Sequence, residues 1–205
     1  GQDELQAPYG IWLDTREAGA VTAHVTDSFM ADFANGVLPE RARLAERVKR
    51  YRVTVQGDRL ETEYLGTFGD TGDAGALRMV ESIAGDVARN RLLVADEDRR
   101  VGSTLREYSL QGQFLGRSLP AFQGDAEGVV LWTCGDDGYW IAADQIDPTL
   151  FRVFERDSLA LAGEFTGRRT ALTDGVTLAG PGPRFPHGAL YALHADTAVA
   201  AFDLG

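Results

Sequence analysis

Short apolar runs separated by turn-forming residues recur along most of this 205-residue chain. Three of these runs begin alike, with an acidic side chain at the third position: Met79-Val80-Glu81-Ser82-Ile83, Asp125-Ala126-Glu127-Gly128-Val129 and Leu172-Thr173-Asp174-Gly175-Val176. Glu81 and Glu127 are 46 residues apart, and Glu127 and Asp174 are 47 apart. Spacing this regular indicates an internal repeat.

Each repeat continues with runs that alternate like half-buried strands. A second apolar run ends in an acid, which is Asp96, Asp144 or Asp196, and a third run carries an aromatic side chain, which is Tyr108, Phe154 or Phe202. A fourth run closes two of the repeats, at 113–116 and 159–162. Each complete repeat is therefore predicted to contain four strands.

The opening part of the chain fits the same pattern with an insertion. Its predicted strands cover 9–13, 21–27, 48–53 and 60–65. Between the second and the third lies a loop over 29–46, in which Pro39–Glu46 is predicted to form a short helix.

A four-strand unit with a period near 46 residues is typical of a β-propeller. We expect an all-β fold in which residues 1–205 form one propeller domain, with blades at 7–66, 78–119, 125–165 and 171–205. The last blade has only three strands, so it leaves an edge to be covered. Gln2–Gln6, sequence from missing N-terminal blades, or a second chain through self-association would supply the fourth strand. A β-sandwich with coincidental spacing is the alternative fold.

The net charge of the chain limits the classes of ligand and partner that it is expected to bind. Twenty basic and 31 acidic side chains give a net charge of −11. Such a surface repels nucleic acid and anionic membranes and favours cations, or substrates held through cations. The single cysteine, Cys134, excludes an intramolecular disulfide.

The repeat places acidic side chains at equivalent points of the innermost strands. Glu81, Glu127 and Asp174 begin three of these strands, Asp125 lies two residues before Glu127, and Glu97 ends a neighbouring strand. Carboxylates gathered at one mouth repel one another unless a hard cation neutralises them, and calcium prefers such oxygen ligands. The competing interpretation is that these acids cap turns, which we favour for an isolated acid such as Asp196.

Several of these motifs together resemble the β-propeller phytases. The resemblance runs from Pro8 to about Leu204 and rests on the order and spacing of Pro8-Tyr9-Gly10, Val80-Glu81-Ser82, Ala95-Asp96-Glu97-Asp98, Asp125-Ala126-Glu127-Gly128, Thr173-Asp174-Gly175 and Gly182-Pro183-Arg184-Phe185-Pro186-His187-Gly188. It implies a six-bladed, secreted or periplasmic enzyme that uses calcium to hydrolyse phosphomonoesters of phytate.

The resemblance also implies roles for individual residues. Calcium would be held by Glu81, Asp125, Glu127, Asp174 and Glu97, with Glu127 and Glu97 also catalytic. Tyr9 would flank the pocket for the phosphorylated small molecule. The chain covers only the C-terminal part of the family, and Ser28 replaces a lysine of the family. Arg168 is the candidate to supply positive charge to the substrate instead.

These departures leave two other functions open. One is a propeller that binds calcium or another ligand without catalysis. The other is a lactonase-like hydrolase of the calcium-propeller type, because that kind of repeat also has the Pro-Tyr-Gly-Ile opening found at Pro8–Ile11.

Overall fold

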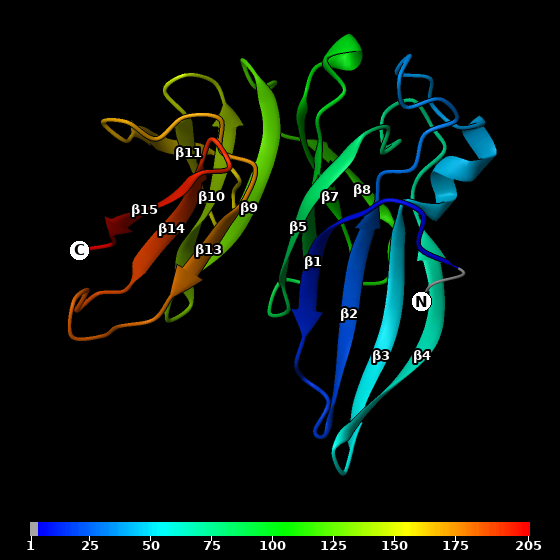
Figure 1. Ribbon diagram of the computed structural model, residues 1–205, viewed down its shortest axis with the longest axis horizontal. Helices are drawn as coiled ribbons and strands as arrows, with labels where there is room; N and C mark the ends of the chain where they lie inside the picture. The colour runs from blue at the N-terminus through cyan, green and yellow to red at the C-terminus, as the bar shows by residue number, and fades with distance from the viewer. Residues whose placement is uncertain (1–3) are drawn as a thin grey trace. The chain divides into compact units, whose positions relative to one another are not determined.

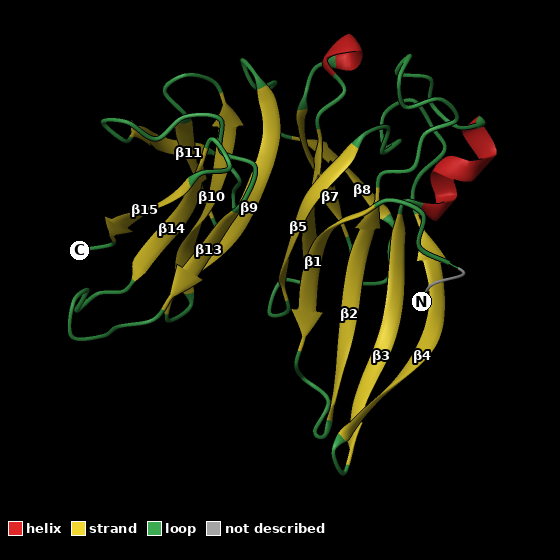
Figure 2. Cartoon of the chain, in the orientation of Figure 1, coloured by secondary structure: helices red, strands yellow, loops and turns green. Residues whose placement is uncertain are grey.

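The computed structural model describes residues 4–205, which form four antiparallel sheets (Figures 1 and 2). The chain divides into two compact units. The first comprises residues 1–97 and 105–118, and the second comprises residues 98–104 and 119–205. Among the described residues, no helix is long and apolar enough to cross a bilayer.

The first unit contains two four-stranded sheets in which consecutive strands are neighbours. One sheet contains β1 (Pro8–Asp14), β2 (Ala20–Asp27), β3 (Val48–Gln56) and β4 (Arg59–Phe68). The other contains β5 (Val80–Asp86), β6 (Arg91–Asp96), β7 (Thr104–Tyr108) and β8 (Phe114–Ser118), with β7 starting at the junction between the units.

The second unit repeats this arrangement. Its four-stranded sheet contains β9 (Asp125–Cys134), β10 (Asp137–Gln145), β11 (Leu150–Glu155) and β12 (Leu161–Thr166). Its last sheet contains only β13 (Val176–Ala179), β14 (Ala189–His194) and β15 (Ala198–Asp203). The predicted all-β class, the four-stranded antiparallel blades and the three-stranded last blade are therefore confirmed.

Helical structure in the described chain is limited to two 3₁₀ turns (Figure 2). The first, η1 (Arg41–Glu46), lies in the predicted insertion and buries Leu44. The second, η2 (Arg99–Val101), connects β6 to β7, and the side chain of Asp98 caps its first turn by accepting from the Arg100 amide.

The N-terminal segment does not complete the last sheet. Glu4–Gln6 form no strand, and the Gln6 and Ala7 amides donate to the Asp27 carboxylate instead. Gln2 and Asp3 lie outside the described residues. The option that Gln2–Gln6 form the fourth strand is thus wrong for Glu4–Gln6, because Asp27 binds this segment in the first unit.

A buried aspartate paired with a cation recurs in each four-stranded sheet. The aspartate is the last or the penultimate residue of the second strand, and the cation lies on the third: Asp27 with Lys49 at 2.6 Å, Asp96 with Arg106 at 3.1 Å, and Asp144 with Arg152 at 2.8 Å. Each aspartate also accepts backbone amides from the loop that leads into the first strand: Gln6 and Ala7, Met79, and Gln123 and Gly124. One carboxylate therefore connects the first three strands of a blade.

His194 takes the place of this aspartate in the last sheet. The Ala171 amide, in the loop before β13, donates to His194 Nδ1 at 3.1 Å. The alignment of Asp196 with Asp96 and Asp144 is therefore wrong by two residues. Asp196 instead lies in the turn between β14 and β15, where Ala195 and Asp196 both have positive φ.

Breaking one of these buried pairs should destabilise the fold strongly. Asp144→Ala removes the buried carboxylate from Arg152 and leaves it only the 37% exposed Glu164 at 3.8 Å, so we expect a loss of about 3–5 kcal/mol in the free energy of unfolding. Urea denaturation measures this loss. The exposed Glu17–Arg52 pair provides the control, since Glu17→Ala should leave the midpoint unchanged. Equal effects of the two variants would contradict the structural role of Asp144.

Acid should destabilise the first unit through His24. Its ring is 2% exposed, near Trp12 and Phe68. Burial, and secondly the charge of Arg50, lowers its pKa from 6.5 to about 4. The unfolded chain therefore binds the proton more readily, so the stability contributed by neutral His24 is complete above pH 6.5 and is lost as the pH falls toward 4.

Replacing His24 should remove this part of the pH dependence. Relative to His24→Phe, the unmodified chain should lose about 2–3 kcal/mol more unfolding free energy between about pH 7 and 4.5. Urea denaturation at each pH measures the difference. His187→Phe, at an exposed position, should follow the unmodified chain. Parallel curves for His24→Phe and the unmodified chain would show that His24 is not the titrating group.

Candidate functional site

A bulge occurs at the same point in the first strand of each four-stranded sheet. The register shifts between Pro8 and Ile11 in β1, between Val80 and Ile83 in β5, and at the corresponding point of β9, opposite Ala142–Asp144. Two residues there face one residue of the second strand: Tyr9 and Gly10, Glu81 and Ser82, and Glu127 and Gly128. The predicted site residues Tyr9, Glu81 and Glu127 therefore occupy equivalent positions.

A glycine at the second bulge position, Gly10 in β1 and Gly128 in β9, allows close packing of neighbouring first strands within a unit. A Cβ atom at Gly128 would lie 2.8 Å from the Val176 amide nitrogen and 3.3 Å from the Gly175 carbonyl carbon. In the first unit, a Cβ at Gly10 would lie 2.7 Å from the Glu81 carbonyl oxygen. Only glycine permits this approach, which brings the backbone that follows Asp174 against the bulge of Glu127.

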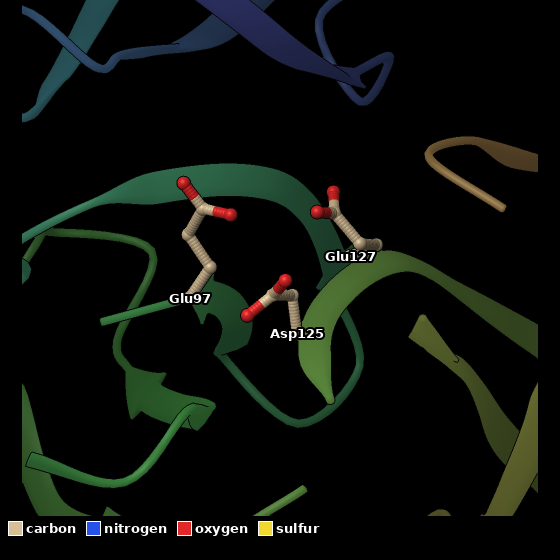
Figure 3. Close-up of side chains that lie close together, drawn as sticks. All are labelled: Glu97, Asp125 and Glu127. Carbon is tan, nitrogen blue, oxygen red and sulfur yellow. The ribbon is translucent and has the colours of Figure 1, made fainter. Parts of the chain in front are cut away.

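Asp125 and Glu127 both lie at the start of β9 (Figure 3). Glu127 is 4% exposed, whereas Asp125 is half-buried. The Arg99 guanidinium binds Asp125 through both oxygens, with Nη2 at 2.5 Å from Oδ2. The Arg99 side chain is otherwise 62% exposed. Asp125 therefore already has a counter-ion from the same unit, which the sequence pattern did not predict.

Asp174 precedes β13 and is held from two sides. The Gln145 side-chain amide donates to Asp174 Oδ1, and Gln145 pairs with Asp125 across β9 and β10. The pKa of Asp174 is raised. Burial is the largest cause, and the hydrogen bond with Asp196 and the negative charge of Asp196 add to it. Asp174 and Asp196 are therefore close neighbours within the second unit. The sequence pattern predicts only turn capping for Asp196, since nothing in its local sequence indicates that the β14–β15 turn directs it to Asp174.

The other predicted residues have different surroundings. In the first unit, Glu81 is 5% exposed, Tyr9 is 51% exposed, and the Glu97 amide donates to the Met79 carbonyl oxygen at 2.9 Å. Figure 3 also labels Glu97, which is the last residue of the first unit before the segment 98–104. In the second unit, Arg168 is exposed on the loop between β12 and β13, ahead of Asp174.

The donor chemistry of the second unit fits a hard cation. Glu127, Asp174 and Asp196 offer carboxylate oxygens, and calcium takes oxygen ligands from flexible carboxylates. A cation would also offset the negative charge of Asp196, which, after burial and the hydrogen bond between the two groups, raises the pKa of Asp174. Asp125 fits less well, because a metal ion would have to displace Arg99 from it.

Ser28, at the position of the family lysine, supplies no charge. It directly follows Asp27, and its amide donates to the Ala7 carbonyl oxygen at 2.8 Å. Two cations lie close by, and both are buried: Arg47 donates to the Asp27 and Phe29 carbonyl oxygens, and Lys49, whose side chain is 4% exposed, binds the Asp27 carboxylate. Positive charge for an anionic ligand therefore has to come from another part of the chain.

Comparison with known proteins identifies the fold. No protein-family model matches the chain, and no curated protein matches it. Among solved structures, the chain is similar to the WD40 repeats of RRP9, with a TM-score of 0.55 and 11% sequence identity. The similarity covers 98% of this chain and 53% of that one, so the chain spans about half the length of that structure. Together with the four meander sheets, this similarity shows that the chain has a β-propeller fold.

Proposed function

We propose that this chain is a calcium-dependent phosphomonoester hydrolase of the phytase type, acting on phytate or a similar phosphorylated small molecule. The observation that carries the proposal is the placement of acids in the second unit, where Asp174 is hydrogen-bonded to Asp196 and directly precedes the backbone packed against the Glu127 bulge. The resemblance of the surrounding motifs to the phytases supports it.

In this proposal, Glu127, Asp174 and Asp196 hold calcium in the second unit, and Asp125 joins them when Arg99 releases it. Glu81 and Glu97, in the first unit, remain ligands predicted from the sequence alone. When bound, calcium attracts a polyanionic substrate and lowers the pKa of a water molecule so that the water can attack phosphorus.

The protein side chains supply proton transfer and orientation. The Glu127 carboxylate accepts the proton of the attacking water, because burial removes it from competing solvent. Glu97 is the second predicted catalytic carboxylate. Arg168, exposed on the loop that leads to Asp174, orients a substrate phosphate group, and Tyr9 flanks the substrate.

A second candidate is a propeller that binds a ligand on this face without catalysis. Two observations favour it. Arg99 already neutralises Asp125, and Ser28 supplies no cation to hold a phosphate group. A lactonase-like hydrolase is the third candidate, and it differs from the first in the bond that it cleaves.

Calcium should stabilise the folded protein if the acidic residues of the second unit bind it. Binding to the folded state alone raises the melting temperature by mass action. We expect millimolar calcium to raise it by several degrees and EDTA to reverse the change. Glu127→Gln, which keeps the side-chain size but removes a charge, should abolish most of the shift. Glu61→Gln, at an exposed position on β4, is the matched control. A melting temperature indifferent to calcium and EDTA would contradict the site.

Phosphate release distinguishes the three candidate functions. With saturating calcium, we expect the chain to release phosphate from phytate, and Glu127→Gln to lower kcat/KM about 100-fold or more. Arg168→Gln should mainly raise KM, because Arg168 binds ground and transition states alike. Opening of a lactone without phosphate release would favour the lactonase-like function. Calcium binding without either reaction would favour the non-catalytic propeller.

A further inference from the structure

The turn that carries Arg99 is attached to the chain around the start of β9. Two residues after η2, the side-chain oxygen of Ser103 accepts from the Ala126 amide at 2.7 Å, and the Ser103 carbonyl oxygen accepts from the Phe122 amide at 2.8 Å. All of these residues belong to the second unit. The contacts that anchor the turn therefore keep Arg99 within reach of Asp125, the first residue of β9.

The backbone of this turn is held by contacts other than those of the Arg99 side chain. The carboxylate of Asp98, a residue that is 2% exposed, accepts from the Arg100 amide at 3.1 Å and from Arg100 Nε at 2.7 Å. The Arg99 carbonyl oxygen accepts from the Gly102 amide at 3.3 Å. Because the Arg99 guanidinium takes no part in these contacts, it is able to leave Asp125 while the turn stays formed.

The pair of Arg99 with Asp125 is exposed enough to be exchanged. Its side chains are 62% and 18% exposed, whereas those of the buried pair of Arg152 with Asp144 are 9% and 0% exposed. Ion pairs that water reaches contribute little to stability, so replacing one partner costs little. A divalent cation also attracts a carboxylate more strongly than a guanidinium does at the same distance, because it carries twice the charge. Calcium is therefore able to displace Arg99 from Asp125.

The Arg99 guanidinium binds Asp125 in a geometry that also suits phosphate. Its Nε and Nη2 atoms donate to different oxygens of the carboxylate. This planar pair of donors matches two oxygens of a phosphate group equally well, which is why arginine is a frequent phosphate ligand. An arginine released from Asp125 would therefore supply positive charge that Ser28 does not.

We propose that Arg99 is a displaceable counter-ion of the calcium site that becomes a ligand of the substrate phosphate. Without calcium, it neutralises Asp125. Once Asp125 binds calcium, η2 keeps the released guanidinium near the start of β9, where it binds a phosphate group of the phosphomonoester. This inference rests on the function proposed above, since it requires calcium and a phosphomonoester at the same site.

Two consequences distinguish this role from that of an ordinary surface ion pair. Arg99 competes with calcium for Asp125, so the site binds calcium more weakly than it would without Arg99. Bound phosphate holds Arg99 away from Asp125, so calcium and phosphate each strengthen the binding of the other, and this coupling is reciprocal.

Isothermal titration of calcium alone into the full chain tests the first consequence. Arg99→Gln removes the competing cation, and we expect it to raise the calcium affinity about fivefold or more. Arg100→Gln is the matched control, because it removes the same charge one residue away from a side chain that binds Asp98 instead of Asp125. In about 0.1 M salt, which screens charges that do not touch the site, it should change the affinity less than about twofold.

The titration separates failure of this inference from failure of the proposed function. Equal calcium affinities of the unmodified chain and Arg99→Gln, or equal gains in the two variants, would overturn the inference and leave the calcium site standing. If none of the three proteins binds calcium, the proposed function fails and the inference fails with it. Both substitutions replace exposed side chains, and melting curves establish that the variants fold.

Methylphosphonate tests the second consequence. It resembles a phosphomonoester, but the proposed reaction does not cleave its P–C bond. We expect it to raise the calcium affinity of the unmodified chain and of Arg100→Gln about fivefold or more, and to have no such effect on Arg99→Gln. An effect that is absent from the unmodified chain, or one that persists in Arg99→Gln, would overturn the inference.

Turnover then separates the two proposals. If calcium and methylphosphonate binding are coupled through Arg99 but no phosphate is released from phytate, the inference is supported and only the hydrolytic step of the proposed function fails. Phosphate release together with uncoupled binding gives the reverse outcome.

Discussion

The buried pair of an aspartate with a cation organises each complete blade of this propeller. An isolated carboxylate in a protein interior is costly, so it requires both a counter-ion and hydrogen-bond donors. Asp144 has both, from Arg152 on the third strand and from the Gln123 and Gly124 amides before the first strand. This arrangement fixes where the loop enters the first strand, and therefore where the bulge and its acidic residue lie.

The bulge then places the acidic side chain of a repeat at a defined point of the first strand, where it can contribute to a binding site. It places Glu81 and Glu127 at equivalent points, and the glycine after Glu127 allows the strand of the next blade to approach closely. Bulges near binding sites commonly redirect a side chain in this way. Holding acids here has an electrostatic cost: burial, and then the neighbouring Asp196, raises the pKa of Asp174, and Asp125 is paired with Arg99.

The second unit has two surfaces with opposite chemistry. The loops before β9 and β13 present carboxylates suited to a hard cation, whereas the edge of β15 presents an apolar groove and backbone groups. The first depends on charge and should respond to calcium and pH.

The sequence by itself determined the blades, because strand alternation and turn spacing are local and recur with a fixed period. It also identified Glu81, Glu127 and Asp174 as equivalent acids. Only the tertiary structure revealed that Arg99 binds Asp125, that Asp196 approaches Asp174, and that His194 replaces the repeated aspartate. These contacts join side chains across loops and strands, and their partners follow from bulges, turn conformations and close backbone packing, none of which leaves a periodic signal in the sequence.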